Sequence, residues 1–408
     1  MKTHFLMVAV CVVAACSSDS TMPQGPEPER PLTVQEKDVA KANTAFGLNL
    51  LHQVNATEPN GNLLLSPLSV SMALGMTLNG AATSTFDAMR QTLAFAGQTQ
   101  NEINVAYNGL LKQLRARDPK IEIGIANSIW YNTGFAVLPT FSDTVKHYFD
   151  AEVRQVDFGN PASPGVINDW VSQKTSGRIK DLIDQISPDE VMFLVNAVYF
   201  KGPWTRTFHE GATASLPFRR PDGSTVTARM MSNDGAYHWV QNDDVYAVEL
   251  LYGDSAFSMV LIAPVAGTSL APVAALLEPA KWEALMASLQ PARIILKMPK
   301  FKFTYEKALK DALSALGMSI AFDQQRADLS RIANVKPENL YISRVQHKTY
   351  IDVHEKGTEA AGATSVGVGV TSMPPQLTFD KPFMFAIRER STGTLLFVGR
   401  LDDPTSTQ

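Results

Sequence analysis

The chain has 408 residues, of which 45% are hydrophobic and 19% are charged, and its formal net charge is −4. This composition is typical of a globular protein with a large core. Length alone favours two or three domains. The body of the chain, however, contains no long Pro/Gly/Ser linker and no repeat, so one large domain remains possible. The slight negative charge gives no reason to expect nucleic acid or an anionic membrane surface as a partner.

The N-terminus has the pattern of a targeting segment. An apolar run over residues 5–15 is too short to span a bilayer. It ends in Val13-Ala14-Ala15-Cys16, which resembles the lipobox of bacterial lipoproteins, where cleavage occurs before a cysteine that becomes lipidated. We therefore predict a signal peptide over residues 1–15 and a lipid on Cys16. The alternative is a plain secretory signal that happens to contain a cysteine.

A flexible tether is predicted over residues 16–37, because the segment 17–31 is rich in Ser, Pro, Gln, Glu and Gly. Ser17 follows the cysteine, and the resemblance to lipoproteins with Ser rather than Asp there favours the outer membrane. The expected location is the cell envelope, lipid-anchored at the outer membrane or surface, or else the secreted fraction. Membrane contact is expected through the lipid only. Cys11 would leave with the signal, so the mature body has no disulfide.

Helices dominate the elements predicted in the first half of the body. Apolar spacing predicts a helix over 39–53. A short buried strand at 62–65 leads into Ser66, which is a plausible helix cap with Pro67 in the first turn. The helix over 68–78 then stops at Asn79-Gly80. A strand is predicted over 121–131 and a helix over 168–175.

Strands dominate the second half. The near-continuous apolar run 191–200 is typical of a strand covered on both faces. A helix is predicted over 306–316, before Gly317. Further strands are predicted over 224–231, 246–252, 257–263, 294–305, 345–353 and 383–388. The fold class that follows is α+β, with large mixed or antiparallel sheets.

The segment 357–371, GTEAAGATSVGVGVT, has the composition of a loop but the alternation of a strand. Small residues dominate it. One set of alternate positions nevertheless ends in Val366, Val368 and Val370, whereas the other set carries Glu359 and little bulk. A period of two is what a strand with one buried face requires.

No catalytic or metal-binding constellation has adequate spacing, so we predict neither an enzyme nor a cofactor. The chain lacks a Gly-x-Ser-x-Gly elbow and a Gly-x-x-x-x-Gly-Lys phosphate loop. His209-Glu210 and His354-Glu355 each begin a zincin-like pattern, but threonine stands where the second histidine is required.

Several motifs, in order and at correct mutual spacing, resemble the serpins. They are Asn62–Ser69 (NLLLSPLS), 193–204 (FLVNAVYFKGPW), 354–363 (HEKGTEAAGA) after His347, 379–383 (FDKPF) and 396–400 (LFVGR). The resemblance implies one α+β domain over 38–408, with three β-sheets, eight or nine helices and an exposed reactive loop at about 357–375. It also implies suicide inhibition of serine, sometimes cysteine, proteases by insertion of the cleaved loop into the central sheet.

The resemblance assigns roles to particular residues. The hinge, where insertion starts, comprises Glu355, Gly357, Thr358, Glu359, Ala360, Ala361, Gly362 and Ala363. The shutter, whose hydrogen bonds rearrange as the sheet opens, comprises Ser66, Ser69, Asn196 and His347. The breach, where the loop enters, comprises Trp204, Lys300 and Glu355. Because the hinge keeps small residues on its inward positions, an inhibitory serpin is predicted. The lipoprotein-like N-terminus indicates one of bacterial type.

The family's usual distance from Glu355 places the scissile bond at Thr371–Ser372, with Val370–Thr371 as the alternative. A small β-branched residue fits the shallow pocket of elastase-like or subtilisin-like proteases. Two other functions remain open: a non-inhibitory serpin that acts as a binding module, and a serpin that is mainly a protease substrate. A monomer is expected, with a risk of polymerisation if the loop of one molecule adds to the sheet of another.

Overall fold

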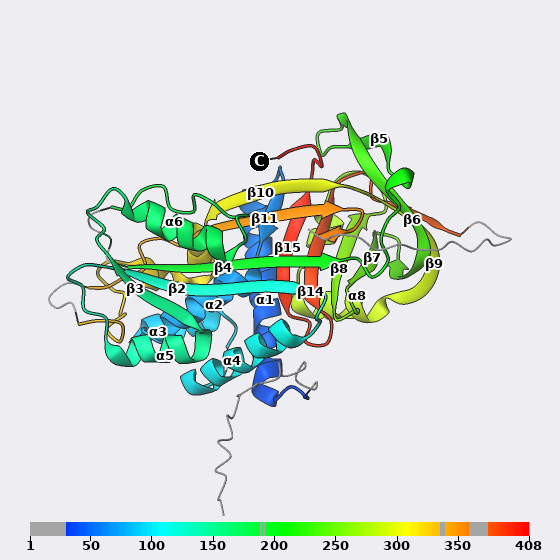
Figure 1. The fold of residues 1–408 in the computed structure, drawn as a ribbon. Coiled ribbons are helices and arrows are strands. Elements are labelled where there is room, and N and C mark those ends of the chain that lie inside the picture. The colour runs from blue at the N-terminus through cyan, green and yellow to red at the C-terminus, as the bar shows by residue number, and fades with distance from the viewer. Residues whose placement is uncertain are drawn as a thin grey trace, which may run out of the picture. The chain divides into compact units, whose positions relative to one another are not determined.

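Two hydrogen-bonded sheets with helices packed around them organise residues 31–408, which form one unit in the computed structural model (Figure 1). The structure describes residues 30–95, 97–187, 190, 192–334, 339–358 and 374–407. None of the helices in these ranges has both the length and the apolar character that a bilayer crossing needs. Within the same ranges the α-helices are α1 Val34–Thr57, α2 Pro67–Leu78, α3 Thr83–Thr92, α4 Gln100–Ala116, α5 Pro139–Phe149, α6 Ser163–Lys174, α7 Ala271–Ala274, α8 Pro279–Ser288 and α9 Lys310–Leu313.

The larger sheet has nine strands. The long strand β6 joins one part, β1-β15-β14-β8-β7, to a second part that contains β9, β13 and β5. β6 pairs with β5 and β9 along most of its length, and with β7 only near its end, over His238 to Gln241. These two parts and the six-stranded sheet described below make up the three sheets that were predicted. The strand order is β1-β15-β14-β8-β7-β6-β9-β13, with bounds β1 Leu63–Leu65, β5 Ala214–Arg219, β6 Thr225–Gln241, β7 Val245–Tyr252, β8 Phe257–Pro264, β9 Gln290–Pro299, β13 Gln376–Thr378, β14 Phe383–Glu389 and β15 Leu395–Leu401.

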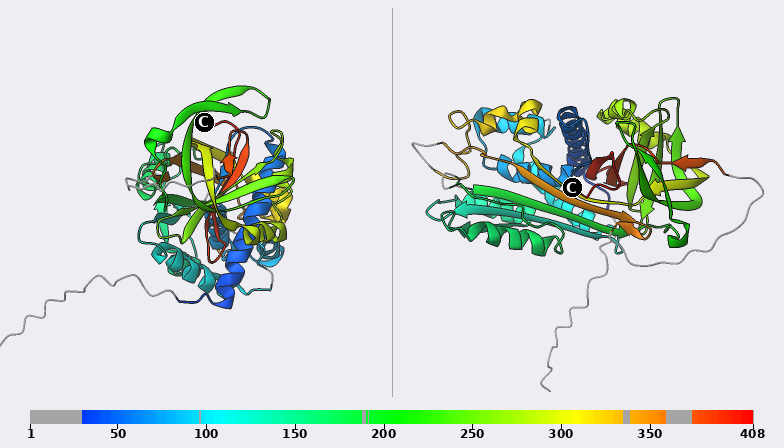
Figure 2. Two further views of the ribbon diagram at one scale, coloured as in Figure 1. Left: turned by 90° about the vertical axis from the view of Figure 1, so that its right-hand side faces the viewer. Right: turned by 90° about the horizontal axis from the view of Figure 1, so that it is seen from above.

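The smaller sheet has six strands in the order β10-β11-β12-β4-β2-β3. Its strand β4 is covered on both faces, as the apolar run predicted. Val195 and Ala197 pack with α6, whereas Val198 and Phe200 belong to the main core. Figure 2 shows helices on the two opposite faces of this sheet. The bounds are β2 Glu122–Asn132, β3 Ala151–Val156, β4 Met192–Pro203, β10 Phe301–Ala308, β11 Gln346–His354 and β12 Gly357–Thr358.

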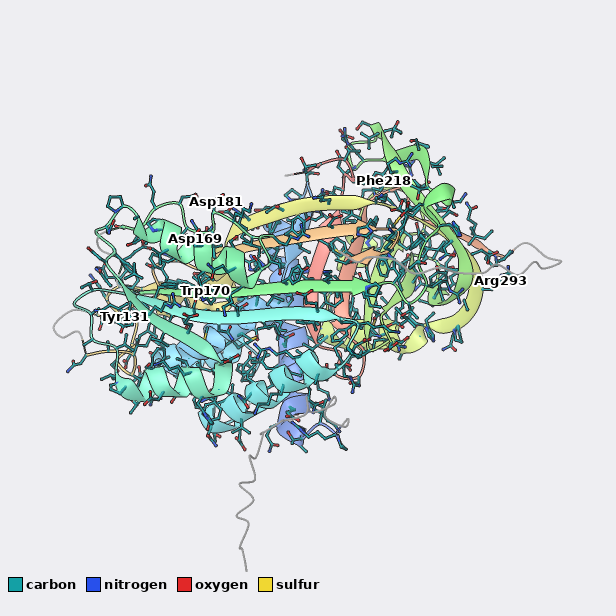
Figure 3. All side chains as sticks on the ribbon, in the orientation of Figure 1. Tyr131, Asp169, Trp170, Asp181, Phe218 and Arg293 are labelled. Carbon is teal, nitrogen blue, oxygen red and sulfur yellow. The ribbon has the colours of Figure 1, made fainter. Side chains whose placement is uncertain are left out.

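Helix α6 is fixed to the sheet by an aromatic contact. Trp170 on α6 meets Trp130 on β2 edge to face, with ring centroids 6.0 Å apart, and Figure 3 shows Trp170 between the helix and the strands. Its indole N–H donates to Glu152 on β3 at 2.6 Å. This side of the sheet therefore has a hydrophobic cluster of its own, apart from the main core.

Local signals explain where the first helices begin. Thr33 and Glu36 form a reciprocal capping box at the start of α1. Residues 34–37, assigned to the tether from sequence, therefore lie in the first helical turn. Ser66 caps α2 as expected, because its Oγ accepts the Ser69 N–H at 3.3 Å, and Pro67 occupies the first turn.

Two predictions in the second half need correction. The strand expected over 294–305 is two strands, β9 and β10, separated at Lys300. The helix expected over 306–316 starts only at Lys310, because residues 306–308 pair with β11. It continues as a π-helical turn, Ser314–Met318, that contains Gly317 at a φ of +110°. Backbone pairing with a neighbouring strand thus outweighs the local helical pattern.

Candidate functional site

The candidate site lies where the chain leaves β11 and turns back into the six-stranded sheet. The two-residue strand β12 lies between β11 and β4 and pairs antiparallel with both. Gly357 is opposite His354 and Pro203, and Thr358 is opposite Val353 and Gly202. The first two loop residues of the predicted hinge are therefore already part of the sheet.

Gly357 occupies a position that only glycine fits. Its φ is +146°, and a Cβ there would lie 2.1 Å from the carbonyl oxygen of Gly202. Thr358 follows and is only 3% exposed. Its Oγ1 is 2.7 Å from the hydroxyl of Tyr252, at the end of β7. The hinge thus enters the sheet with the buried Thr358 hydroxyl hydrogen-bonded to Tyr252.

The three breach residues converge around this entry point. The indole N–H of Trp204 donates to the His354 carbonyl at 2.9 Å, and its backbone N–H donates to the Lys356 carbonyl at 2.9 Å. The same indole stacks on Tyr252 with ring centroids 4.3 Å apart. Trp204 is therefore bonded to the turn that precedes β12 and packed on the residue that holds Thr358.

Glu355 is held in the same turn by two side chains. Lys300 Nζ lies 2.8 Å from its Oε2, and Thr213 Oγ1 donates to its Oε1 at 2.7 Å. Burial alone would raise the pKa of Glu355, but these hydrogen bonds more than compensate and keep it below its ordinary value. The two charged breach residues thus form an ion pair with an ionised carboxylate.

The four shutter residues form one chain of hydrogen bonds, because Ser66 Oγ, which accepts the Ser69 N–H at 3.3 Å, joins its two ends. Ser66 N–H donates to His347 Nε2 on β11 at 3.1 Å, and burial lowers the pKa of His347 to about 4, so the imidazole is neutral. Ser69 Oγ donates to the Asn196 carbonyl on β4 at 3.4 Å, and the Asn196 amide donates to Asn127. Asn196 Oδ1 is buried and has no hydrogen-bond partner in the described part of the chain.

Among the described strands, β12 alone pairs with both β4 and β11. Among the described strands no ladder joins β4 directly to β11. No direct hydrogen bond between described residues joins His347 to Asn196, which lie on these two strands; they are linked only through Ser66 and Ser69 at the start of α2. Beyond the residues that pair with β12, the facing edges of β4 and β11 therefore carry backbone groups with which a further strand could pair.

Several predicted residues lie outside the described ranges. They are Cys16, Glu359, Ala360, Ala361, Gly362, Ala363, Val370, Thr371 and Ser372. No cluster of three His, Cys, Asp or Glu side chains suited to a metal ion occurs in the residues that the structure describes.

Sequence reasoning missed Tyr252 and Thr213, which hold Thr358 and Glu355. Tyr252 was assigned only to a strand. The partners are 106 and 142 residues apart along the chain. No local pattern therefore marks either one.

Comparison with known proteins gives a consistent result. The family model "Serpin (serine protease inhibitor)" matches residues 41–404. A serpin-like protein of Thermococcus kodakarensis is 34% identical, covering 91% of this chain and 87% of its own length. Neuroserpin of Rattus norvegicus is 33% identical over 88% of this chain and 90% of its own.

Solved structures match at the level of the whole fold. The native state of tengpin, a thermophilic serpin, superposes with a TM-score of 0.83 at 28% identity, covering 93% of this chain and 97% of tengpin. Human thyroxine-binding globulin in complex with its ligand gives the same TM-score and identity, covering 91% of this chain and all of the globulin. With the α+β fold and three sheets confirmed, this chain belongs to the serpin family, whose members are in general protease inhibitors rather than enzymes.

Proposed function

We propose that this protein is a suicide inhibitor of serine proteases that traps the acyl-enzyme by inserting its cleaved loop between β4 and β11. The observation that carries the proposal is β12, which is seated between two strands whose facing edges pair with no other described strand. A longer strand can add there without breaking an existing ladder. Strand addition of this kind supplies main-chain hydrogen bonds along its whole length.

The register of β12 defines where the remaining loop residues would pair. Continued without a shift, this register would bring Ala360 opposite Phe200 and Ile351, and Val368 opposite Met192. Residues with the parity of Thr358 would point to the same side as its buried side chain. This set includes Val366 and Val368, and burial of each would contribute about 1.5–3 kcal/mol.

Insertion would also move an attached protease a long way. As a strand, residues 358–371 would extend roughly 46 Å at ~3.3 Å per residue. The intact loop is tethered at both ends, by β12 and by β13. Cleavage removes one tether, so we propose that insertion is completed only after the protease has attacked.

We propose Thr371–Ser372 as the reactive bond, with Val370–Thr371 as the alternative. Both bonds offer a small or aliphatic residue to the protease. These residues favour elastase-like or subtilisin-like serine proteases, and cysteine proteases of similar preference, as targets.

The first experiment is incubation of residues 17–408 with an elastase and, separately, with subtilisin. Denaturing gels and mass spectrometry of the released peptide would follow. A denaturant-stable complex and a peptide beginning at Ser372 are expected, and a peptide beginning at Thr371 would move the bond. Clean cleavage with fully active protease would identify a substrate, whereas no cleavage by either enzyme would favour a binding module.

Thr358→Arg gives a sharper test, because it would bury a charge at a position that is 3% exposed. We expect complex formation to fall at least about tenfold while loop cleavage continues. Gln376→Arg is the matched control, since Gln376 is exposed on β13 at the other end of the loop. Equal trapping by both variants would contradict insertion at β12.

The edges of β4 and β11 that no described strand pairs also offer a site to the loop of a second molecule. We propose a monomer that polymerises on mild heating. Size-exclusion chromatography that shows only monomer after heating would contradict this.

We further propose that the protein is of bacterial origin and that Cys16 carries a lipid that anchors it in the cell envelope. Metabolic labelling with a radioactive fatty acid should mark the full-length chain but not its Cys16→Ser variant. Equal labelling of both would refute the anchor, and absence of label from both would favour a plain secretory signal.

A further inference from the structure

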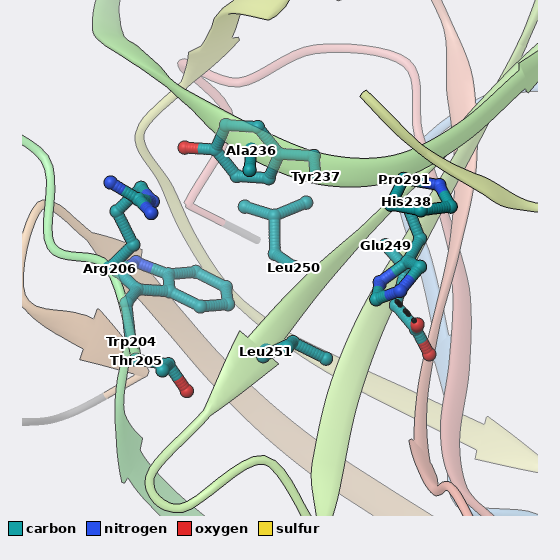
Figure 4. Close-up of a pocket in the computed structure, with 10 residues that line it drawn as sticks. All are labelled: Trp204, Thr205, Arg206, Ala236, Tyr237, His238, Glu249, Leu250, Leu251 and Pro291. Carbon is teal, nitrogen blue, oxygen red and sulfur yellow. Dashed lines mark ion pairs between the residues drawn. The ribbon is translucent and has the colours of Figure 1, made fainter. Parts of the chain in front are cut away.

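A cavity of about 160 Å³ lies directly behind the breach, between the segment after β4 and the strands β6, β7 and β9. Its apolar lining includes Trp204, Leu250, Leu251 and Pro291 (Figure 4). An apolar cavity of roughly 150 Å³ is known to accommodate benzene. The space therefore suits one aromatic ring or a short chain of similar volume.

One buried polar group in this cavity has no hydrogen-bond partner among the described residues. Tyr237 lines the cavity and is 7% exposed, and its hydroxyl makes no hydrogen bond within the described part of the chain. Buried polar groups are nearly always paired, and an unpaired one costs about 1–3 kcal/mol. Burial raises the pKa of this hydroxyl, so it remains a proton donor at any ordinary pH.

A cation stands next to this donor. Arg206 lines the same cavity and is exposed, and Figure 4 shows the Tyr237 hydroxyl pointing to the side on which its guanidinium lies. No ion pair of Arg206 occurs among the described residues. Its side chain lies against Gly235, where a Cβ would be 2.6 Å from Arg206 Cδ.

The acidic groups nearby are already engaged. Glu249, also in the lining, accepts hydrogen bonds from Arg388 and Ser258 at 2.8 Å each. Asp234, which interacts electrostatically with Arg206, accepts hydrogen bonds from Nε and Nη2 of Arg293. The end of the cavity formed by Arg206 and Tyr237 thus offers a cation and a hydroxyl donor.

We propose that this cavity binds a small aromatic carboxylate, with its ring against Trp204 and Leu250 and its carboxylate between Arg206 and the Tyr237 hydroxyl. The carboxylate would accept the hydrogen bond that Tyr237 lacks and a charge-assisted one from Arg206. The apolar wall would hold a ring of the size that the cavity admits.

The site has a direct connection to the hinge. Trp204 is one wall of the cavity, and it also binds the His354 and Lys356 carbonyls and stacks on Tyr252. A ligand packed against Trp204 favours the arrangement in which β12 is seated. By linkage, release of β12 must weaken ligand binding by the factor by which the ligand favours the seated over the released state of β12.

The test uses 3-phenylpropionate as the probe and neutral 3-phenylpropionamide as its control, with residues 17–408. Calorimetry and saturation-transfer NMR should detect the acid, with the amide about tenfold weaker. Arg206→Gln should weaken the acid about tenfold and leave the amide unchanged. Tyr237→Phe should weaken the acid about threefold or more without loss of thermal stability, because the hydroxyl it removes has no partner in the part of the chain that the structure describes. Arg229→Gln, an exposed change elsewhere on β6, is the matched control.

Two more variants complete the test. Gly235→Ala should displace Arg206 and weaken the acid while the fold persists, because the clash is with the end of a flexible side chain. Thr358→Arg, which unseats β12, should weaken the acid at least about threefold. No detectable binding of the acid, equal binding of acid and amide, or wild-type affinity in both Arg206→Gln and Tyr237→Phe would overturn the site. Unchanged affinity in Thr358→Arg would overturn the connection to the hinge. These readouts need no protease, so they stand apart from the test of inhibition.

Discussion

Acid should destabilise this serpin through the shutter histidine, His347. The imidazole is 5% exposed, and burial lowers its pKa from 6.5 to about 4. Between these values the unfolded chain binds a proton that the folded chain does not. The free energy of unfolding therefore falls as the pH drops from 6.5 to 4. At ~1.36 kcal/mol per pKa unit the loss is about 3 kcal/mol at pH 4, of which about 2 kcal/mol is lost by pH 5.

His347→Gln isolates this contribution. The glutamine carbonyl can accept the Ser66 N–H that His347 Nε2 accepts now, but it does not titrate. Urea unfolding, followed by circular dichroism at pH 8, 7, 6 and 5, would be compared between the wild type and the variant. His52→Gln, an exposed change on α1, controls for the loss of a histidine.

The expected result is that the variant loses about 2 kcal/mol less stability than the wild type between pH 8 and pH 5. His52→Gln should follow the wild type. An equal loss of unfolding free energy between pH 8 and pH 5 in the wild type and in His347→Gln would refute the reasoning, because His347 could not then be a buried neutral group.

Two further predictions concern the breach and the hinge. Glu355→Gln should lower the free energy of unfolding by about 1–2 kcal/mol in urea denaturation, a modest figure because Lys300 is 39% exposed. Lys300→Gln should have a similar effect, and unchanged stability in both would show that the pair contributes nothing. Gly357→Ala should expel β12, because its Cβ would strike the Gly202 carbonyl, and hydrogen exchange along β4 should increase. Gly134→Ala, also at positive φ but with open space around it, is the matched control; equal exchange in the two variants would contradict the clash.

Local chemistry in the sequence predicted much of the framework. The Ser66-Pro67 start of α2, the doubly covered strand β4 and the strands β7 and β8 follow from caps and apolar patterns read over a few residues. Ordered motifs at the right spacing also predicted the family, and with it the three sheets. The helix expected over 306–316 was wrong in its first turn, since local pattern cannot anticipate the pairing of residues 306–308 with β11.

The sequence alone determined that this chain is a serpin with small residues at its hinge, because each of the motifs involved consists of residues that are neighbours along the chain. Only the tertiary structure decided that β12 is seated between β4 and β11 and that Tyr252 holds Thr358. Within the described part of the chain, it also decided that the Tyr237 hydroxyl beside Arg206 has no hydrogen-bond partner. A period of two says which residues share a face of a strand, but not which strand lies opposite or in what register. Those choices depend on how the whole core packs, and they place side chains 106 residues apart within hydrogen-bond distance.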